Sequence, residues 1–102
     1  MAGDNRLTLE ATVSDRGELR YTPAGIPAIE LTLMHASVQG EAGGERRVEC
    51  EMAAVAFGEQ ALSLSRVPKG ATLRCEGFVA RRWRTGVTVA LHVQRHEITK
   101  GN

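Results

Sequence analysis

Aromatic residues are scarce in this sequence: Phe, Trp and Tyr make up only 4% of its 102 residues. A core must therefore be built mainly from Val, Leu, Ile and Ala, and every aromatic side chain outside the core becomes a candidate binding contact. No apolar run approaches the roughly 18 residues of a membrane span. The N-terminus also lacks the basic and then apolar segments of an export signal. We therefore expect a cytoplasmic protein that does not associate with a membrane.

The sequence is equally poor in groups that carry out catalysis or hold a metal. Cys50 and Cys75 lack Cys-x-x-Cys spacing, so we expect buried free thiols in a reducing compartment. His92 and His96 would lie about 13 Å apart along a strand, and no carboxylate or thiolate spacing completes a metal site. The serines carry no nucleophile signature, and no Gly-rich loop resembles a phosphate cradle. We expect no enzyme, no catalytic residue, no metal and no cofactor.

Charge is balanced overall but unevenly distributed. A net charge of +1 argues against a globally basic nucleic-acid protein. Acidic residues gather in 41–51 and basic residues in 81–84, and such local clusters dominate within a Debye length of about 8–10 Å. With 102 residues, the chain can bury one modest core. We expect a single domain over 1–102, with loose tails at 1–4 and 100–102.

Alternation of apolar and polar residues predicts five strands, and its loss over 58–65 predicts a helix of one or two turns. Within the third strand, the apolar run Met52–Phe57 predicts burial on both faces. Gly77, in the middle of the fourth strand, predicts a bulge or a sharp bend. Three glycines within 39–44 predict a flexible hairpin tip. The strands are expected at residues 7–13, 28–38, 47–57, 71–82 and 87–98.

The predicted order of elements is three strands, one helix and two further strands, and this is the order of the OB fold. This all-β class is a partly open, five-stranded Greek-key barrel, here with one short helix between the third and fourth strands. A five-stranded sandwich without a groove is the alternative, but the bend at Gly77 and the position of the helix favour the barrel. In OB folds, strands two and three and the loops 1–2 and 4–5 form the usual oligonucleotide groove.

Basic and aromatic residues fall on the loops that border this groove. At the strand 4–5 tip, guanidinium groups would neutralise phosphates and an indole would stack on a base, worth about 1–3 kcal/mol. The alternative is a solvated tip whose Trp83 covers the edge of the barrel. For Arg46 and Arg47 the alternative is charge pairing with Glu45 and Glu49. The candidate nucleic-acid-binding residues are Arg20, Tyr21, Arg46, Arg47, Arg81, Arg82, Trp83 and Arg84.

Four stretches carry a resemblance to a known family: Asn5–Leu7, Pro23–Pro27, His35–Gly43, and Gly77-Phe78 together with Leu91-His92. Over residues 5–98 the chain resembles the primosomal replication protein N (PriB) family, relatives of bacterial single-stranded DNA-binding proteins. The resemblance implies a non-enzymatic homodimer that binds single-stranded DNA. It also implies that the protein helps the PriA helicase assemble the primosome, which reloads the replicative helicase at stalled forks.

The same resemblance implies further partners and an interface. DnaT and other primosome proteins are candidate partners, and the dimer is expected to pair through the first strand, at Leu7, Leu9, Ala11 and Val13. The chain departs from the family at Gly44 and Glu49, where relatives carry aromatic residues and bases. Its strand 4–5 loop is also shorter and has arginines in place of lysines. We therefore expect weak DNA binding, and a protein–protein adaptor with little DNA affinity is the alternative function.

Overall fold

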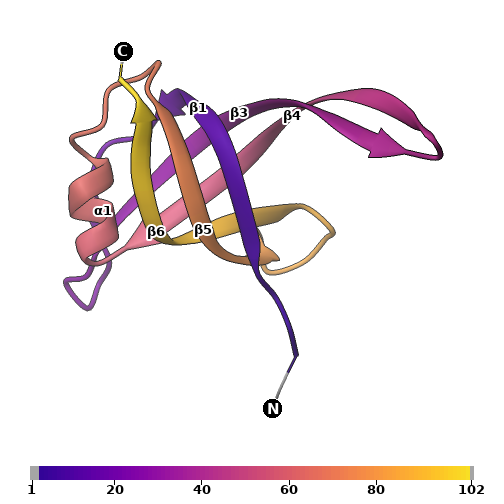
Figure 1. Cartoon of the computed structure of the whole chain (residues 1–102). Helices are drawn as coiled ribbons and strands as arrows, with labels where there is room; N and C mark the ends of the chain where they lie inside the picture. Colours follow the sequence, from indigo (N-terminus) through magenta and orange to yellow (C-terminus); the bar gives the residue numbers. More distant parts are fainter. Residues whose placement is uncertain (1–2, 102) are drawn as a thin grey trace.

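The computed structural model describes residues 3–101 as a small barrel with one helix and one projecting hairpin (Figure 1). The sheet order is β1-β5-β6-β4-β3-β2, and pairing of β1 with β3 closes the ring. The predicted all-β barrel, with its helix after the third long strand, is confirmed; the two-residue β2 is an addition. The elements are β1 (Leu7–Arg16), β2 (Arg20–Tyr21), β3 (Pro27–Glu41), β4 (Gly44–Phe57), α1 (Glu59–Leu64), β5 (Thr72–Arg81) and β6 (Val89–Lys100).

A bulge in β5 bends the sheet where the sequence predicts it. The register between β5 and β6 shifts between Glu76 and Gly77. A Cβ atom at Gly77 would lie 1.8 Å from the backbone oxygen of His92, far inside van der Waals contact. Only glycine lets the two strands approach this closely, so the prediction of a bulge at Gly77 is confirmed.

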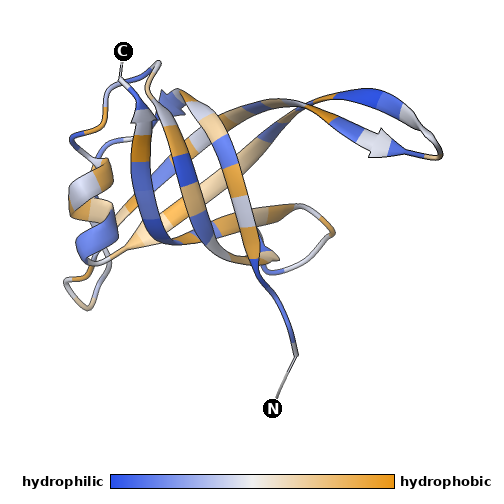
Figure 2. Cartoon of the chain, in the orientation of Figure 1, coloured by the Kyte–Doolittle hydropathy of each residue, from blue (hydrophilic) through white to orange (hydrophobic). Residues whose placement is uncertain are grey.

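The core is aliphatic, as the shortage of aromatic residues predicts. Alternating residues of β1, β3 and β5 point inward, and Figure 2 shows this alternation of hydropathy along β1 and β5. Ala61 and Leu64 of α1 complete the core cluster. Among residues 3–101, no aromatic side chain is in the core and no helix is long and apolar enough to cross a membrane. The largest fully buried side chains are Ile29, Leu33, Leu64, Leu73, Leu91, Val13 and Cys75.

The β3–β4 hairpin is longer and more regular than the predicted flexible tip. Pairing continues to Glu41 opposite Gly44, so only Ala42 and Gly43 form the turn. Both turn residues have positive φ, 53° and 79°, which matches the right-handed twist of a two-residue hairpin. Figure 1 shows this hairpin projecting from the barrel. At the other end of the chain, Lys100 ends β6 rather than lying in a loose tail. Residues 1, 2 and 102 of the predicted tails lie outside the described residues.

Two burial predictions for β4 are wrong. Ala54 and Ala56 are buried, but Ala53 and Val55 are only partly buried and Phe57 is 44% exposed. The strand keeps its alternation through the apolar run, so only one of its faces meets the core. Cys50 is exposed because it lies beyond the barrel on the projecting hairpin. Cys75 is buried as predicted, and burial raises the pKa of its thiol to about 11.

Candidate nucleic-acid interface

A shallow hollow of about 210 Å³ brings together three of the predicted arginines. Arg20 comes from β2, Arg81 ends β5, and Arg82 follows it in the β5–β6 loop. We call this site the basic hollow. Glu30 also lines it, and the rest of its lining comes from β4 and β6. These lining residues are Ala53, Ala54, Val55, Phe57, Ala90 and His92.

An aromatic row crosses the sheet and includes two of these lining residues, Phe57 and His92. Phe78 and His92 are register partners on β5 and β6, with ring centroids 4.7 Å apart and planes within 15°. Phe57 of β4 continues the row, with its centroid 6.2 Å from that of His92. Since Leu91 and Val93 point into the core, His92 points outward. The row Phe57–His92–Phe78 therefore gives the hollow a partly exposed face on which a base can stack.

Trp83, at the tip of the β5–β6 loop, is exposed rather than packed on the barrel edge. The residue is 58% exposed, and the Arg82 guanidinium lies 4.7 Å from its ring centroid. The Arg82 N–H donates to the Thr88 backbone oxygen over 2.8 Å and so closes the base of the loop. This cation–π contact links the tip to the basic hollow, because Arg82 belongs to both.

The arginines around the hollow are open to an anionic ligand. Arg20 lies 3.8 Å from Glu30, and both side chains are about half exposed, so this surface pair is weak. Arg81, Arg82 and Arg84 have no ion pair with any residue of the 3–101 range. Phosphate oxygens are the ligands that such unpaired guanidinium groups favour.

The structure does not place Arg46 and Arg47 in this hollow. They are successive residues of β4, paired with Gln39 and Val38, so their side chains point to opposite faces of the hairpin. Arg46 bonds to Glu41 over 3.1 Å, a different partner from the predicted Glu45 and Glu49. Tyr21 is exposed but does not line the hollow. The eight candidates therefore divide into three arginines that line the hollow, Trp83 and Arg84 on the adjoining β5–β6 loop, the pair on the hairpin, and Tyr21 apart from all of these.

The first strand has an open edge, but two of its four expected interface side chains face inward. Ala11 and Val13 are buried in the chain's own core, and Leu7 and Leu9 pack partly against it. A partner that pairs with this strand would therefore meet its backbone edge rather than the side chains of Ala11 and Val13, and the expected interface at Leu7, Leu9, Ala11 and Val13 stays a prediction. Val13 bonds to the β5 side, through Ala71 and Gly70, so the backbone groups of alternate residues such as Thr8 face the opposite edge.

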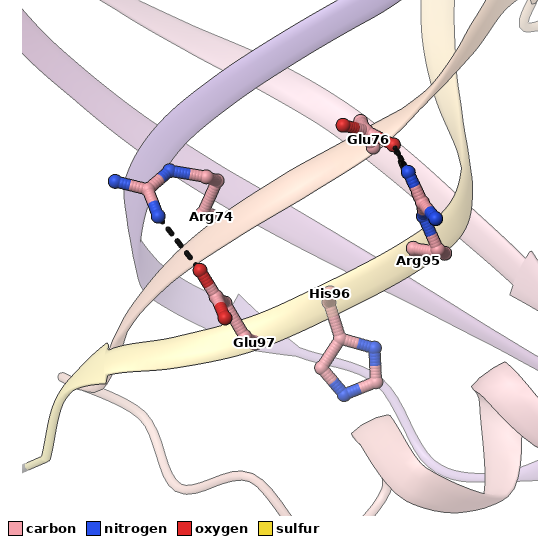
Figure 3. A pocket seen from close by; sticks show the side chains of 5 residues that line it. All are labelled: Arg74, Glu76, Arg95, His96 and Glu97. Atoms are coloured by element: carbon pink, nitrogen blue, oxygen red, sulfur yellow. Dashed lines mark hydrogen bonds and ion pairs between the residues drawn. The ribbon is translucent and has the colours of Figure 1, made fainter.

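A second hollow, of about 310 Å³, is lined by Arg74, Glu76, Arg95, His96 and Glu97 (Figure 3). Arg74 bonds to Glu97 over 2.7 Å, and Arg95 bonds to Glu76 and lowers the pKa of that carboxyl. Each of these guanidinium groups already has a carboxylate partner. This hollow therefore offers less to a phosphate than the basic hollow does, despite its larger volume.

His96, at the edge of the second hollow, ties β6 to α1. Its Nδ1 lies 2.6 Å from Gln60 Oε1, and its Nε2 lies 3.1 Å from Ser63 Oγ. Burial lowers the pKa of His96, because it disfavours the charged imidazolium. Among the described residues, no three His, Cys, Asp or Glu side chains gather where they could hold a metal ion.

Known proteins are similar to this chain in both sequence and architecture. A family model described as "another single-strand binding protein family" matches residues 5–95. Replication restart protein PriB of Bordetella pertussis is 46% identical over 91 residues, covering 89% of this chain and 85% of that protein. The solved structure of PriB from Ralstonia solanacearum superposes with a TM-score of 0.88 at 35% identity, covering 95% and 99% of the two chains.

A structure outside the PriB group gives the same fold. The wild-type single-stranded DNA binding protein from Thermus aquaticus superposes with a TM-score of 0.78 at 26% identity. The match covers 99% of this chain and 52% of that protein. The chain therefore belongs to the PriB family of replication restart proteins, within the single-strand binding proteins.

Proposed function

We propose that this protein binds single-stranded DNA as an accessory protein of the replication-restart primosome. The observation that carries the proposal is the basic hollow, in which Arg20, Arg81 and Arg82 surround an apolar, partly aromatic lining. The guanidinium groups neutralise phosphates, while the exposed ring of Phe57 offers a face to a base. Stacking of this kind is tolerant of sequence, because every base has a π-face. Family membership and the likeness to single-stranded DNA-binding proteins support the same function.

The salt dependence of oligo-dT binding tests this proposal. If Arg20, Arg81, Arg82 and Arg84 neutralise about four phosphates, log K falls against log salt with a slope of roughly −2.8. Trp83 is exposed beside Arg82, so its fluorescence reports the titration. A duplex of the same length is the control and is expected to bind more weakly, because its bases are not free to stack. Equal binding of duplex and single strand, or a slope near zero, contradicts the proposal.

We further propose that the protein assists the PriA helicase in reloading the replicative helicase at stalled forks. Its membership in the PriB family supports this role. The double variant Arg82→Glu/Arg84→Glu tests whether assistance to PriA is separate from DNA binding. Both arginine side chains are exposed and have no ion pair within residues 3–101, so the change is expected to leave the fold intact. The variant is expected to lose oligo-dT binding and still be retained by immobilised PriA. Loss of both activities would mean that one surface serves both partners.

A protein–protein adaptor with little DNA affinity is the second candidate function. Residues 39–51 contain four glutamates and two arginines, and carboxylates near a DNA track repel phosphates. A wild-type protein that is retained by PriA without DNA, and that fails to bind oligo-dT at low salt, would establish this candidate in place of the first.

We also propose that the protein is a homodimer joined through the edge of β1. β3 pairs with β1 only from Thr12 onward, so the edge at Thr8 has no strand partner among the described residues. A second copy would satisfy it and remove an aggregation hazard. Thr8→Pro removes the outward N–H and is expected to give a folded monomer in sedimentation, whereas Thr8→Ala stays dimeric. A dimer that persists in Thr8→Pro contradicts this interface.

A further inference from the structure

The hairpin formed by residues 34–51 of β3 and β4, which we call the arm, extends beyond the support of the barrel (Figure 1). β1 pairs with β3 no farther along the arm than Met34, and β6 pairs with β4 only over Ala53–Val55. Both edges of the ribbon therefore lack a strand partner among residues 3–101. Two-stranded hairpins are marginally stable alone in water, so a ribbon of this length gains stability from a partner.

The outer face of the arm combines an apolar stripe with a row of carboxylates. Residues paired across a ribbon share a face, which places Met34 with Glu51, Ala36 with Glu49, and Val38 with Arg47. Met34 and Val38 are 40% and 58% exposed, so the stripe is uncovered. The outer face is defined by Met34, Ala36 and Val38 of β3 and by Glu45, Arg47, Glu49 and Glu51 of β4.

The charge of this outer face disfavours DNA. The outer face carries three glutamates and one arginine. Arg46 lies on the opposite face and is bonded to Glu41. The outer face belongs to the same side of β4 as Phe57 in the basic hollow, because the strand alternates without a break from one to the other. A phosphate backbone that left the hollow along β4 would meet Glu51 and Glu49, which repel it. The two ends of this side of β4 therefore fit ligands of opposite charge.

We propose that the outer face of the arm binds a basic, extended segment of a protein partner. The apolar side chains of the segment would cover Met34 and Val38, and its lysines or arginines would pair with Glu49 and Glu51. An extended segment fits because its side chains alternate with the same period of two as the ribbon, and the open edges offer it backbone hydrogen bonds. This site does not require the proposed DNA-binding function, since it shares no residue with the basic hollow.

A labelled twelve-residue peptide of alternating Lys and Val, followed by fluorescence anisotropy with the full chain, tests the proposal. The double variant Glu49→Gln/Glu51→Gln is expected to weaken binding about tenfold, because two ion pairs are lost. Val38→Ser is expected to weaken binding about fivefold through loss of apolar contact. The matched control Glu18→Gln/Glu59→Gln changes the net charge equally on exposed residues away from the arm and is expected to bind like the wild type.

Three results would overturn the proposal, and each identifies a different explanation. An equal loss in the control variant would mean general attraction of a basic peptide to the protein. Loss of self-association by the arm variants in sedimentation would make a second copy the occupant. Amide shifts of the arm caused by oligo-dT in an NMR titration, with weaker binding by Val38→Ser, would make DNA the occupant. Failure of the DNA function leaves the expected peptide result unchanged, so the two proposals fail separately.

Discussion

Gly77→Ala is expected to prevent folding or to lower the free energy of unfolding by at least about 4 kcal/mol. The added methyl carbon would lie 1.8 Å from the His92 backbone oxygen and 2.9 Å from its carbonyl carbon. Relief requires the backbones of β5 and β6 to separate, and each of them is also paired on its other edge, with β1 and β4. Urea denaturation followed by circular dichroism measures the loss, and absence of soluble protein is its extreme form.

Gly40→Ala is the matched control for this substitution. Gly40 is also a strand glycine without positive φ, but a Cβ there has no neighbour closer than 4.0 Å. Alanine is expected to leave the free energy of unfolding unchanged or to raise it by about 0.5–1 kcal/mol, because the unfolded chain loses freedom. A Gly77→Ala protein that unfolds within about 1 kcal/mol of wild type would show that the strands can separate at little cost.

The same glycine shows how much of the fold can be read from the sequence. Glycine inside a strand usually marks a bulge or a bend, so Gly77 predicts the bend of β5. The loss of apolar–polar alternation after Phe57 predicts α1. The sequence offers only a family resemblance for the motif at Asn5, whereas the structure gives its physical reason. The Asn5 side chain bonds to both the backbone oxygen and the backbone N–H of Val79, which attaches the start of the chain to β5. No local pattern indicates a contact across 74 residues.

The apolar run Met52–Phe57 has no apolar–polar alternation, so its sequence does not show which face of the strand is buried. A continuous apolar run is compatible with two kinds of strand. Either both faces of the strand are buried, or one face is buried and the other lines a shallow site. The prediction of full burial leaves Phe57 out of the candidate binding residues, and His92 enters the sequence analysis as a rejected metal ligand and as part of a family motif, not as a binding residue. The sequence does contain a signal for an aromatic binding surface. Phe57 and Phe78 are two of only four aromatic residues, and both adjoin small residues in strands. The sheet register that aligns Phe78 with His92 lies outside what the sequence shows.

The candidate site was partly predictable for a related reason. Arg20, Arg81 and Arg82 converge because loops that border one groove of a known fold lie near one another. The sequence places Arg46 and Arg47 together at the base of a hairpin loop beside the same groove. Adjacent residues of a strand face opposite ways, so a regular hairpin separates them, whereas a flexible loop need not. Their prediction depended on where β4 begins, and the structure begins it at Gly44.

Phe57→Ala is expected to weaken oligo-dT binding by about 10- to 100-fold, since a stacked base contributes about 1–3 kcal/mol. Phe57 is 44% exposed and lies outside the core, so loss of its ring leaves the core intact and the urea midpoint close to that of wild type. Phe57→Trp keeps an aromatic face and is expected to retain binding. Anisotropy of a labelled oligo-dT measures all of these affinities at one salt concentration. Val87→Ala, which truncates a side chain that is 93% exposed, is the control for loss of apolar surface alone.

The comparison with Trp83→Ala decides where the bases lie. Phe57 and His92 line the basic hollow, whereas Trp83 stands at the tip and reaches the hollow only through Arg82. If the strand lies in the hollow, Phe57→Ala costs more affinity than Trp83→Ala, and the double variant adds the two losses when each ring stacks on a different base. If Phe57→Ala binds like wild type while Trp83→Ala does not, the bases stack at the tip and the hollow serves only as a source of positive charge.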